Sequence, residues 1–283
     1  MSRESEPKAN QAPVDQSAPY NPGELFDTTA EYYSRYRVAY PDQMFEHLRA
    51  RLSLDGSQVV LDLGCGTGLF TIPLSRHVQS VIAVDPEPSM LAEGARWARD
   101  AGRRNIDWRR GDSYGLAEMA LPKLDLTVIA AAFHWMDRAE VLRVLDELTR
   151  EDGAVVVATG GVAGAEKGPW DHVIADVRKK YLGPHRRAGK GLHLPDPVPV
   201  ESILDDSPFS GVEEATWEWE YERDLDSLIG LQFSLSWSTP AQFRDDDHRR
   251  AFEQEVRRVL SDEFPSGRFV QKITSRALIA HRP

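Results

Sequence analysis

Apolar and polar residues alternate along the middle of the chain with two recurring periods. Short apolar runs predict buried strands, and stretches of helical spacing between them predict amphipathic helices. The predicted strands span residues 58–63, 80–84, 106–110, 124–130 and 153–159, and the predicted helices between them span 69–76, 89–101 and 138–148. Strands that alternate with helices form parallel sheets covered on both faces, so the pattern predicts a doubly wound α/β fold.

The pattern changes toward both ends of the chain. Residues 1–24 hold few apolar side chains, and we expect a disordered tail because little surface can be buried there to offset ordering entropy. Residues 25–57 contain two predicted helices, expected to form a lid, and the second begins at Pro41. The remaining segments are the core at 58–160, an irregular insertion or cap at 161–212, and a C-terminal part at 213–283 that completes the sheet and the cap.

The C-terminal part returns to regular patterning. It predicts a strand at 213–222, helices at 225–237 and 247–264, and a closing strand at 269–280. Within the insertion, only 173–181 has helical spacing.

Composition and charge narrow the class of partner. The 283 residues carry 34 Lys and Arg against 45 Asp and Glu, a net charge of −11. An acidic chain repels phosphate backbones unless its basic residues cluster, so we expect no nucleic-acid partner. No apolar run approaches the ~20 residues of a membrane helix, no signal peptide is apparent, and Cys65 is the single cysteine. We therefore expect a cytoplasmic protein, a monomer or homodimer, without membrane contact.

A glycine-rich loop carries the first chemical signal. Asp62-Leu63-Gly64-Cys65-Gly66-Thr67-Gly68 follows the first predicted strand and leads into a helix. Glycines let the backbone approach a ligand closely, and free N–H groups of the helix point to the same edge of the sheet. Alone, the loop indicates a tight turn or a nucleotide-like ligand. Its G-x-G-x-G spacing differs from the usual G-x-G-x-x-G of dinucleotide-binding loops.

Two acidic positions follow the next two strands. Asp85 ends the second predicted strand, about 20 residues after the loop, where a carboxylate can accept from ribose hydroxyls. The alternative for Asp85 is a helix cap ahead of Pro86. Gly111-Asp112-Ser113 follows the third strand, where Asp112 could accept from an adenine amino group or close a simple Asx turn.

These segments together resemble class I S-adenosylmethionine-dependent methyltransferases of type 11/25. The glycine loop looks like the family's first motif, Asp85 like its ribose-binding acid, and Gly111-Asp112-Ser113 like its adenine-side motif. Ala131-Ala132-Phe133-His134-Trp135 and Tyr33-x-x-Tyr36-Arg37-x-x-Tyr40-Pro41 resemble the small-molecule, trans-aconitate-methyltransferase-like branch. That branch commonly reads Tyr-Arg-Pro-x-Tyr-Pro, and here Val38 replaces the first proline.

The resemblance implies a Rossmann-like, seven-stranded sheet with one antiparallel strand, S-adenosyl-L-methionine as cofactor, and a small-molecule acceptor. Arg37 could bind the carboxylate of the cofactor or be a solvated helix arginine. The residues that the resemblance assigns to the cofactor are Tyr33, Arg37, Gly64, Cys65, Gly66, Gly68, Asp85, Pro86, Met90, Gly111, Asp112, Ser113, Ala131 and Phe133.

The acceptor side is less patterned. His134 is the candidate catalytic base because it follows the fourth strand and imidazole takes a proton near neutral pH; the alternative is that it only shapes the pocket. A hydroxyl or amine acceptor could need such a base, whereas a carboxylate needs none. We expect no metal, because the histidines of the insertion lack a compact ligand spacing. Four tryptophans could line an aromatic pocket or belong to the core: Trp170, Trp217, Trp219 and Trp237.

Three other functions remain open at this point. The first is a nicotinamide oxidoreductase, for which the glycine spacing is unusual. The second is a protein that binds S-adenosylmethionine without transferring its methyl group. The third is a nucleic-acid or protein methyltransferase, which a basic surface groove would favour.

Overall fold

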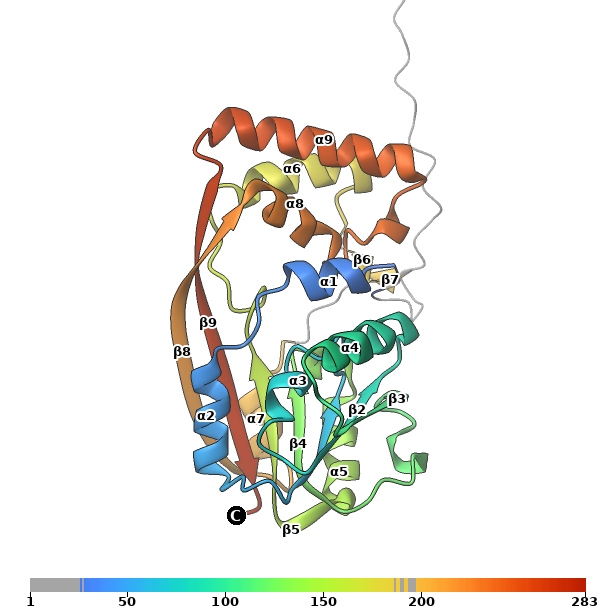
Figure 1. Cartoon of the computed structure of the whole chain (residues 1–283), viewed down its shortest axis with the longest axis vertical. Helices are drawn as coiled ribbons and strands as arrows, with labels where there is room; N and C mark the ends of the chain where they lie inside the picture. The colour runs from blue at the N-terminus through green and yellow to red at the C-terminus, as the bar shows by residue number, and fades with distance from the viewer. Residues whose placement is uncertain (1–25, 27, 186, 189–190, 193–196) are drawn as a thin grey trace, which may run out of the picture.

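The computed structural model describes residues 26, 28–185, 187–188, 191–192 and 197–283. The tail expected at 1–24 and His193, one of the histidines of the insertion, lie outside the described residues. The sheet has seven strands in the order β3-β2-β1-β4-β5-β9-β8 (Figure 1). The strands are β1 (Val59–Leu63), β2 (Ser80–Asp85), β3 (Ile106–Arg110), β4 (Leu124–Ala130), β5 (Thr149–Thr159), β8 (Gly211–Asp224) and β9 (Arg268–His281).

Strands β1 to β5 are parallel, and β9 runs antiparallel to both β5 and β8. The seven-stranded sheet with one antiparallel strand is therefore confirmed. Strand β1 pairs with β2 on one side and β4 on the other, so the strand order reverses at β1. Ligands of doubly wound sheets bind outside the carboxyl ends of the strands at such a reversal.

Helices cover both faces of the sheet. The elements on and around it are α1 (Ala30–Tyr36), α2 (Asp42–Arg51), α3 (Thr71–Leu74), α4 (Pro88–Asp100), η2 (Leu116–Glu118), η3 (Phe133–Trp135) and α5 (Arg138–Leu148). The later elements are α6 (Asp171–Leu182), a short hairpin of β6 (Arg187–Ala188) and β7 (Gly191–Leu192), α7 (Val200–Asp205), α8 (Leu225–Phe233), η4 (Pro240–Gln242) and α9 (Asp246–Glu263).

Several element boundaries differ from the predicted ones. Helix α3 is shorter than the predicted 69–76, because Gly68 has a φ of +80° and the loop continues to Phe70 before the helix starts. Strand β5 begins at Thr149 instead of residue 153. Its first four residues are mostly exposed and polar, so the sequence shows no strand pattern there. Helix α8 ends at Phe233 instead of 237, where the hydroxyl of Ser234 donates to the carbonyl oxygen of Leu231 at 2.7 Å. Helix α7 was not predicted.

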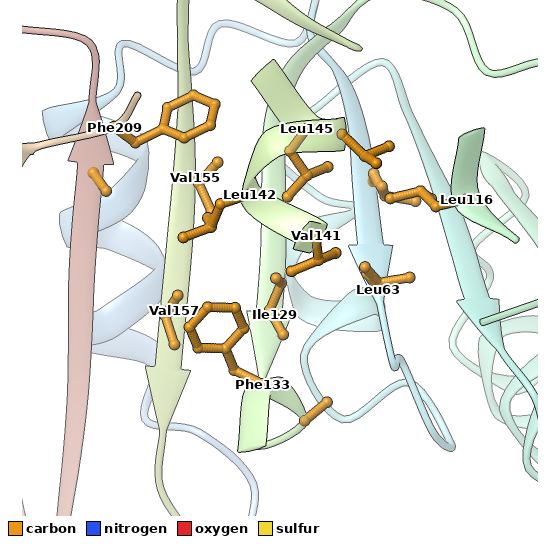
Figure 2. Close-up of a cluster of buried hydrophobic side chains, with 14 of the residues drawn as sticks. Leu63, Leu116, Ile129, Phe133, Val141, Leu142, Leu145, Val155, Val157 and Phe209 are labelled. Carbon is orange, nitrogen blue, oxygen red and sulfur yellow. The ribbon is translucent and has the colours of Figure 1, made fainter. Parts of the chain in front are cut away.

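The core consists of apolar layers on the two faces of the sheet. On one face, Leu142 and Leu145 of α5 pack on strand residues such as Val155, as Figure 2 shows. On the other face, Met44 and Leu48 of α2 pack on the sheet with α3. Burial on both faces explains why the strands read as continuous apolar runs rather than alternating ones.

A third apolar cluster forms a cap beyond the carboxyl ends of the parallel strands. It contains residues of α6, α8 and α9 together with Phe269 of β9, and the ends of β8 and β9 extend to the cap (Figure 1). Helix α1 contacts this cap through the rings of Tyr32 and Phe233, whose centroids are 5.1 Å apart, and it contacts α4 through a 2.7 Å hydrogen bond from Ser34 to Glu93. Among the described helices, none is long and apolar enough to cross a membrane.

Candidate functional site

The glycine loop adopts backbone conformations that favour glycine at three positions. Gly64, Gly66 and Gly68 all have positive φ, at +77°, +54° and +80°. A Cβ at Gly64 would lie 2.5 Å from Cβ of Ala132, and one at Gly68 would lie 2.7 Å from the ring of Trp108. These two glycines therefore allow close packing inside the protein. A Cβ at Gly66 would meet only Cε1 of Tyr33, at 3.9 Å.

Asp85 connects the loops after β1 and β2. Its Oδ2 accepts from the N–H of Gly66 at 2.8 Å, and its Oδ1 accepts from the N–H of Glu87 at 3.0 Å. Burial raises the pKa of Asp85 to about 6, against the lowering effect of these hydrogen bonds. The cap of α4 is Glu87, which accepts from Ser89, so the interpretation of Asp85 as the helix cap is wrong.

A cavity lies at this edge of the sheet, and we call it the loop cavity. It has a volume of about 710 Å³, including its open mouth. Ten of the fourteen residues assigned to the cofactor line it: Tyr33, Gly64, Gly66, Asp85, Pro86, Met90, Gly111, Asp112, Ser113 and Ala131. Residues from four separate strand ends thus meet where the reversal of strand order predicts a ligand.

The other four assigned residues lie elsewhere. Arg37 and Cys65 line a smaller neighbouring cavity of about 450 Å³. Gly68 lies beneath Trp108 and lines none of these cavities. Phe133 is 3% exposed, and η3 directs its ring back into the cluster under α5, between Val157 and Ile129 (Figure 2). The structure therefore places the Phe133 side chain in the core and not at the loop cavity.

Arg37 is not a solvated helix arginine. Its Nε donates to Oγ of Ser234 at 2.9 Å, and a terminal nitrogen donates to the carbonyl oxygen of Ser234 at 2.7 Å. The guanidinium lies 4.6 Å from the ring centroid of Tyr33, and burial lowers the pKa of Arg37. This arginine therefore joins the segment after α1 to the segment after α8.

Asp112 closes the turn expected for it, while its expected contact with adenine stays a prediction. Its Oδ1 accepts from the N–H groups of Tyr114 and Gly115, both at 3.0 Å, which is an Asx-type turn. It also lines the loop cavity. The turn orients the carboxylate at the end of β3, where it remains accessible to a ligand.

The described residues fit S-adenosylmethionine. The loop cavity combines one buried carboxylate, that of Asp85, with apolar walls from Pro86 and Met90. These groups match a ribose and an adenine ring. The space above Gly66, which a Cβ would fill, leaves room between the glycine loop and Tyr33.

A third and larger cavity lies under the cap, and we call it the cap cavity. Its volume is about 2030 Å³, and it shares four lining residues with the loop cavity, namely Phe26, Tyr33, Ala131 and Trp135. Ala131 has a φ of +54°, which is uncommon for a residue with a Cβ and marks a constrained turn directly after β4. The two cavities therefore meet at Tyr33 and Ala131.

The candidate acceptor residues divide between the cap cavity and the core. His134 is exposed and lines the cap cavity, with its ring 4.7 Å from that of Trp135. Trp237 also lines it. Trp170 packs on Phe269 in the core of the cap, Trp217 faces His47 of α2, and Trp219 does not line the cavity.

Sequence reasoning missed two arginines of the cap cavity, Arg178 and Arg223. A signal for Arg223 was present: it continues the alternation of Trp217, Trp219 and Tyr221 and therefore lies on the same face of β8. Among the described residues, no cluster of three or more His, Cys, Asp and Glu side chains is arranged to hold a metal ion.

Comparisons with known proteins agree with this geometry. The family described as a methyltransferase domain matches residues 60–153. An uncharacterized methyltransferase of Mycobacterium tuberculosis is 30% identical over 224 residues, which cover 77% of this chain and 80% of the relative. Trans-aconitate 2-methyltransferase of the same species is 28% identical over 241 residues, covering 78% and 83% of the two chains.

A solved structure from Anaeromyxobacter dehalogenans, described as a type II methyltransferase, superposes with a TM-score of 0.59 at 20% identity. The match covers 87% of this chain and 98% of that one, and it shows a shared fold. The chain belongs to the class I S-adenosylmethionine-dependent methyltransferases. This membership replaces the interpretation as a nicotinamide oxidoreductase.

Proposed function

We propose that this protein transfers the methyl group of S-adenosylmethionine to a small organic acceptor bound in the cap cavity. The observation that carries the proposal is the junction of the two cavities at Tyr33 and Ala131. A methyl group has to pass between donor and acceptor in line, so both must meet at one place from which water is excluded. The similarity to trans-aconitate 2-methyltransferase supports a small-molecule acceptor.

The cofactor supplies a methyl group that its sulfonium already activates, so the protein mainly has to bind and align. Asp85 would accept from ribose hydroxyls, Pro86 and Met90 would pack on the adenine, and Asp112 with Ser113 would flank its edge. Gly66 leaves room for the chain of the cofactor, and Gly64 lets the loop pack against Ala132 beside it. Arg37 lines the neighbouring cavity and would face the methionine carboxylate.

His134 is the imidazole of the cap cavity and the candidate base for a hydroxyl or amine acceptor. Its exposure keeps the ring in contact with solvent, which can receive the proton. A carboxylate acceptor would leave His134 with a role in shaping the pocket alone. We further propose that the protein acts in the cytoplasm, as a monomer or homodimer, without a nucleic-acid partner.

Two measurements test this function. Isothermal titration with S-adenosylmethionine and with S-adenosylhomocysteine should show binding of both to one site per chain. A methyl-transfer assay with labelled S-adenosylmethionine and a panel of small acids, alcohols and amines should then yield a labelled small molecule. Absence of binding by both compounds, or label transfer only to protein or nucleic acid, would overturn the proposal.

A further inference from the structure

Three arginines line the cap cavity: Arg37 after α1, Arg178 on α6 and Arg223 near the end of β8. Among the described residues, none of the three forms an ion pair with a carboxylate. The two acids of the cavity wall have other partners. Oε1 of Glu166 lies 3.8 Å from Nζ of Lys272, and Asp171 accepts from the N–H of Gly168 at 2.6 Å. In an acidic chain, this cavity is lined by more cationic than anionic side chains.

Arg223 is the most deeply buried of the three, at 2% exposure. One terminal nitrogen donates to the carbonyl oxygen of Tyr36 at 2.9 Å, and the guanidinium lies 4.8 Å from the ring centroid of Tyr221. Its Nε is buried and has no hydrogen-bond partner. Burial lowers the pKa of Arg223, and the nearby charge of Arg37 lowers it further.

Arg178 has the same kind of unmet donor. One of its terminal nitrogens, Nη1, is buried without a partner. Burial lowers the pKa of Arg178. A buried donor without an acceptor costs stability, so native proteins rarely keep one unless a ligand or a water satisfies it. Arg178 and Arg223 are therefore two cationic side chains of one cavity, from different elements, whose charge no carboxylate among the described residues balances.

We propose that Arg178 and Arg223 bind a carboxylate of the acceptor molecule. This inference rests on the proposed function, because it assigns the acceptor to the cap cavity. The planar guanidinium matches a carboxylate through paired N–H donors. Arg37 is less available, because its Nε and one terminal nitrogen already donate to Ser234. Glu166 and Asp171 on the same wall repel negative charge, so they favour a carboxylate group, which carries one charge, over a phosphate group, which carries two.

The test measures binding to the complex of the full-length protein with S-adenosylhomocysteine. The probes are succinate, trans-aconitate, benzoate and octanoate, the methyl esters of these four acids, and inorganic phosphate. We expect at least one acid to bind and its ester not to bind. Arg178→Gln and Arg223→Gln should each lower the affinity for that acid at least tenfold and leave the affinity for S-adenosylhomocysteine unchanged.

Arg258→Gln is the matched control, since Arg258 is exposed and pairs with Asp262 on α9. Thermal unfolding shows whether Arg223→Gln folds. If it does not, Arg223→Lys replaces it. This variant keeps the charge and should lower the affinity for the acid by a smaller factor. The proposal is overturned if none of the four acids binds, if the variants bind them as tightly as the parent protein, or if phosphate binds in their place.

The two proposals fail in different ways. If the parent protein does not bind S-adenosylhomocysteine, the proposed function itself is contradicted. Retained S-adenosylhomocysteine binding, with methyl transfer to an uncharged acceptor and no binding of the acids, would contradict only the carboxylate inference.

Discussion

Asp85, the last residue of β2, accepts a 2.8 Å hydrogen bond from the backbone N–H of Gly66 in the loop after β1. Its second oxygen accepts from Glu87 at the start of α4. A single carboxylate thus joins the loops that follow two neighbouring parallel strands, and both loops line the loop cavity. The residue proposed to hold the ribose is therefore also the residue that holds the glycine loop in place.

Replacing Asp85 should affect both stability and cofactor affinity. We expect Asp85→Ala to lower the free energy of unfolding by about 1–3 kcal/mol, because two backbone donors lose their acceptor. The affinity for S-adenosylhomocysteine should fall at least tenfold. Thermal unfolding and isothermal titration measure the two effects. Asp100→Ala is the control, since that exposed carboxylate pairs with Arg96 at the surface. Parent-like affinity in Asp85→Ala would contradict the assignment.

Gly66 can be tested against a glycine of similar backbone conformation. Gly66 has a φ of +54° and Gly267 a φ of +62°. Alanine at either position should cost about 1–2 kcal/mol of stability from the left-handed backbone. Only the Cβ at Gly66 would enter the space next to Tyr33, whereas the one at Gly267 would have no atom within 4 Å. We expect similar melting temperatures for Gly66→Ala and Gly267→Ala, but weakened S-adenosylhomocysteine binding for Gly66→Ala alone. Equal affinities would show that the space above Gly66 is not used.

Asp62 should give the stability a pH dependence. Its side chain is fully buried, its Oδ2 accepts from Thr71 at 2.5 Å, and its Oδ1 has no partner. Burial raises its pKa from 3.8 to about 7, so the folded state binds the proton more tightly than the unfolded state. The stabilising contribution of the proton is complete below about pH 4 and is lost as the pH rises toward 7.

Asp62→Asn should remove that loss. We expect its free energy of unfolding to exceed that of the parent at pH 8 by an amount on the order of a few kcal/mol, and the difference to shrink toward pH 4. Urea unfolding at a series of pH values measures it, with Asp107→Asn as the exposed control. A parent-like pH slope in Asp62→Asn would refute the raised pKa.

His134 can be separated from its alternative role by kinetics. If the acceptor identified by the methyl-transfer assay loses a proton on methylation, we expect His134→Gln to lower kcat about 100-fold or more. The affinity for S-adenosylhomocysteine should not change. His172→Gln is the control, because His172 is exposed on α6 and does not line the cap cavity. An unchanged kcat with a raised KM would assign His134 to the pocket wall.

The cofactor half of the site could be predicted from short segments. Gly64 and Asp112 each follow a strand and Asp85 ends one, and the carboxyl ends of parallel strands meet at one edge of a sheet. Knowing that the strands are parallel was therefore sufficient to bring these residues together. Phe133 was misplaced because strand ends predict which residues lie near the edge, but not which way a side chain in the following turn points.

The acceptor half required the tertiary structure. Arg37 and Ser234 are 197 residues apart, and no local pattern relates them. Arg178 and Arg223 come from a helix and a strand whose own patterns only say which face is buried. Their meeting in one cavity depends on how α6, α8 and α9 pack over the ends of β8 and β9.

By itself, the sequence determined the α/β fold, the single antiparallel strand implied by the family resemblance, and the glycine loop that we propose holds the methyl donor. These features are encoded by periodicity and by motifs within a few residues of a strand end. The tertiary structure alone decided what adjoins the loop cavity, because the cap cavity is enclosed by segments distant in sequence that only long-range apolar packing brings together.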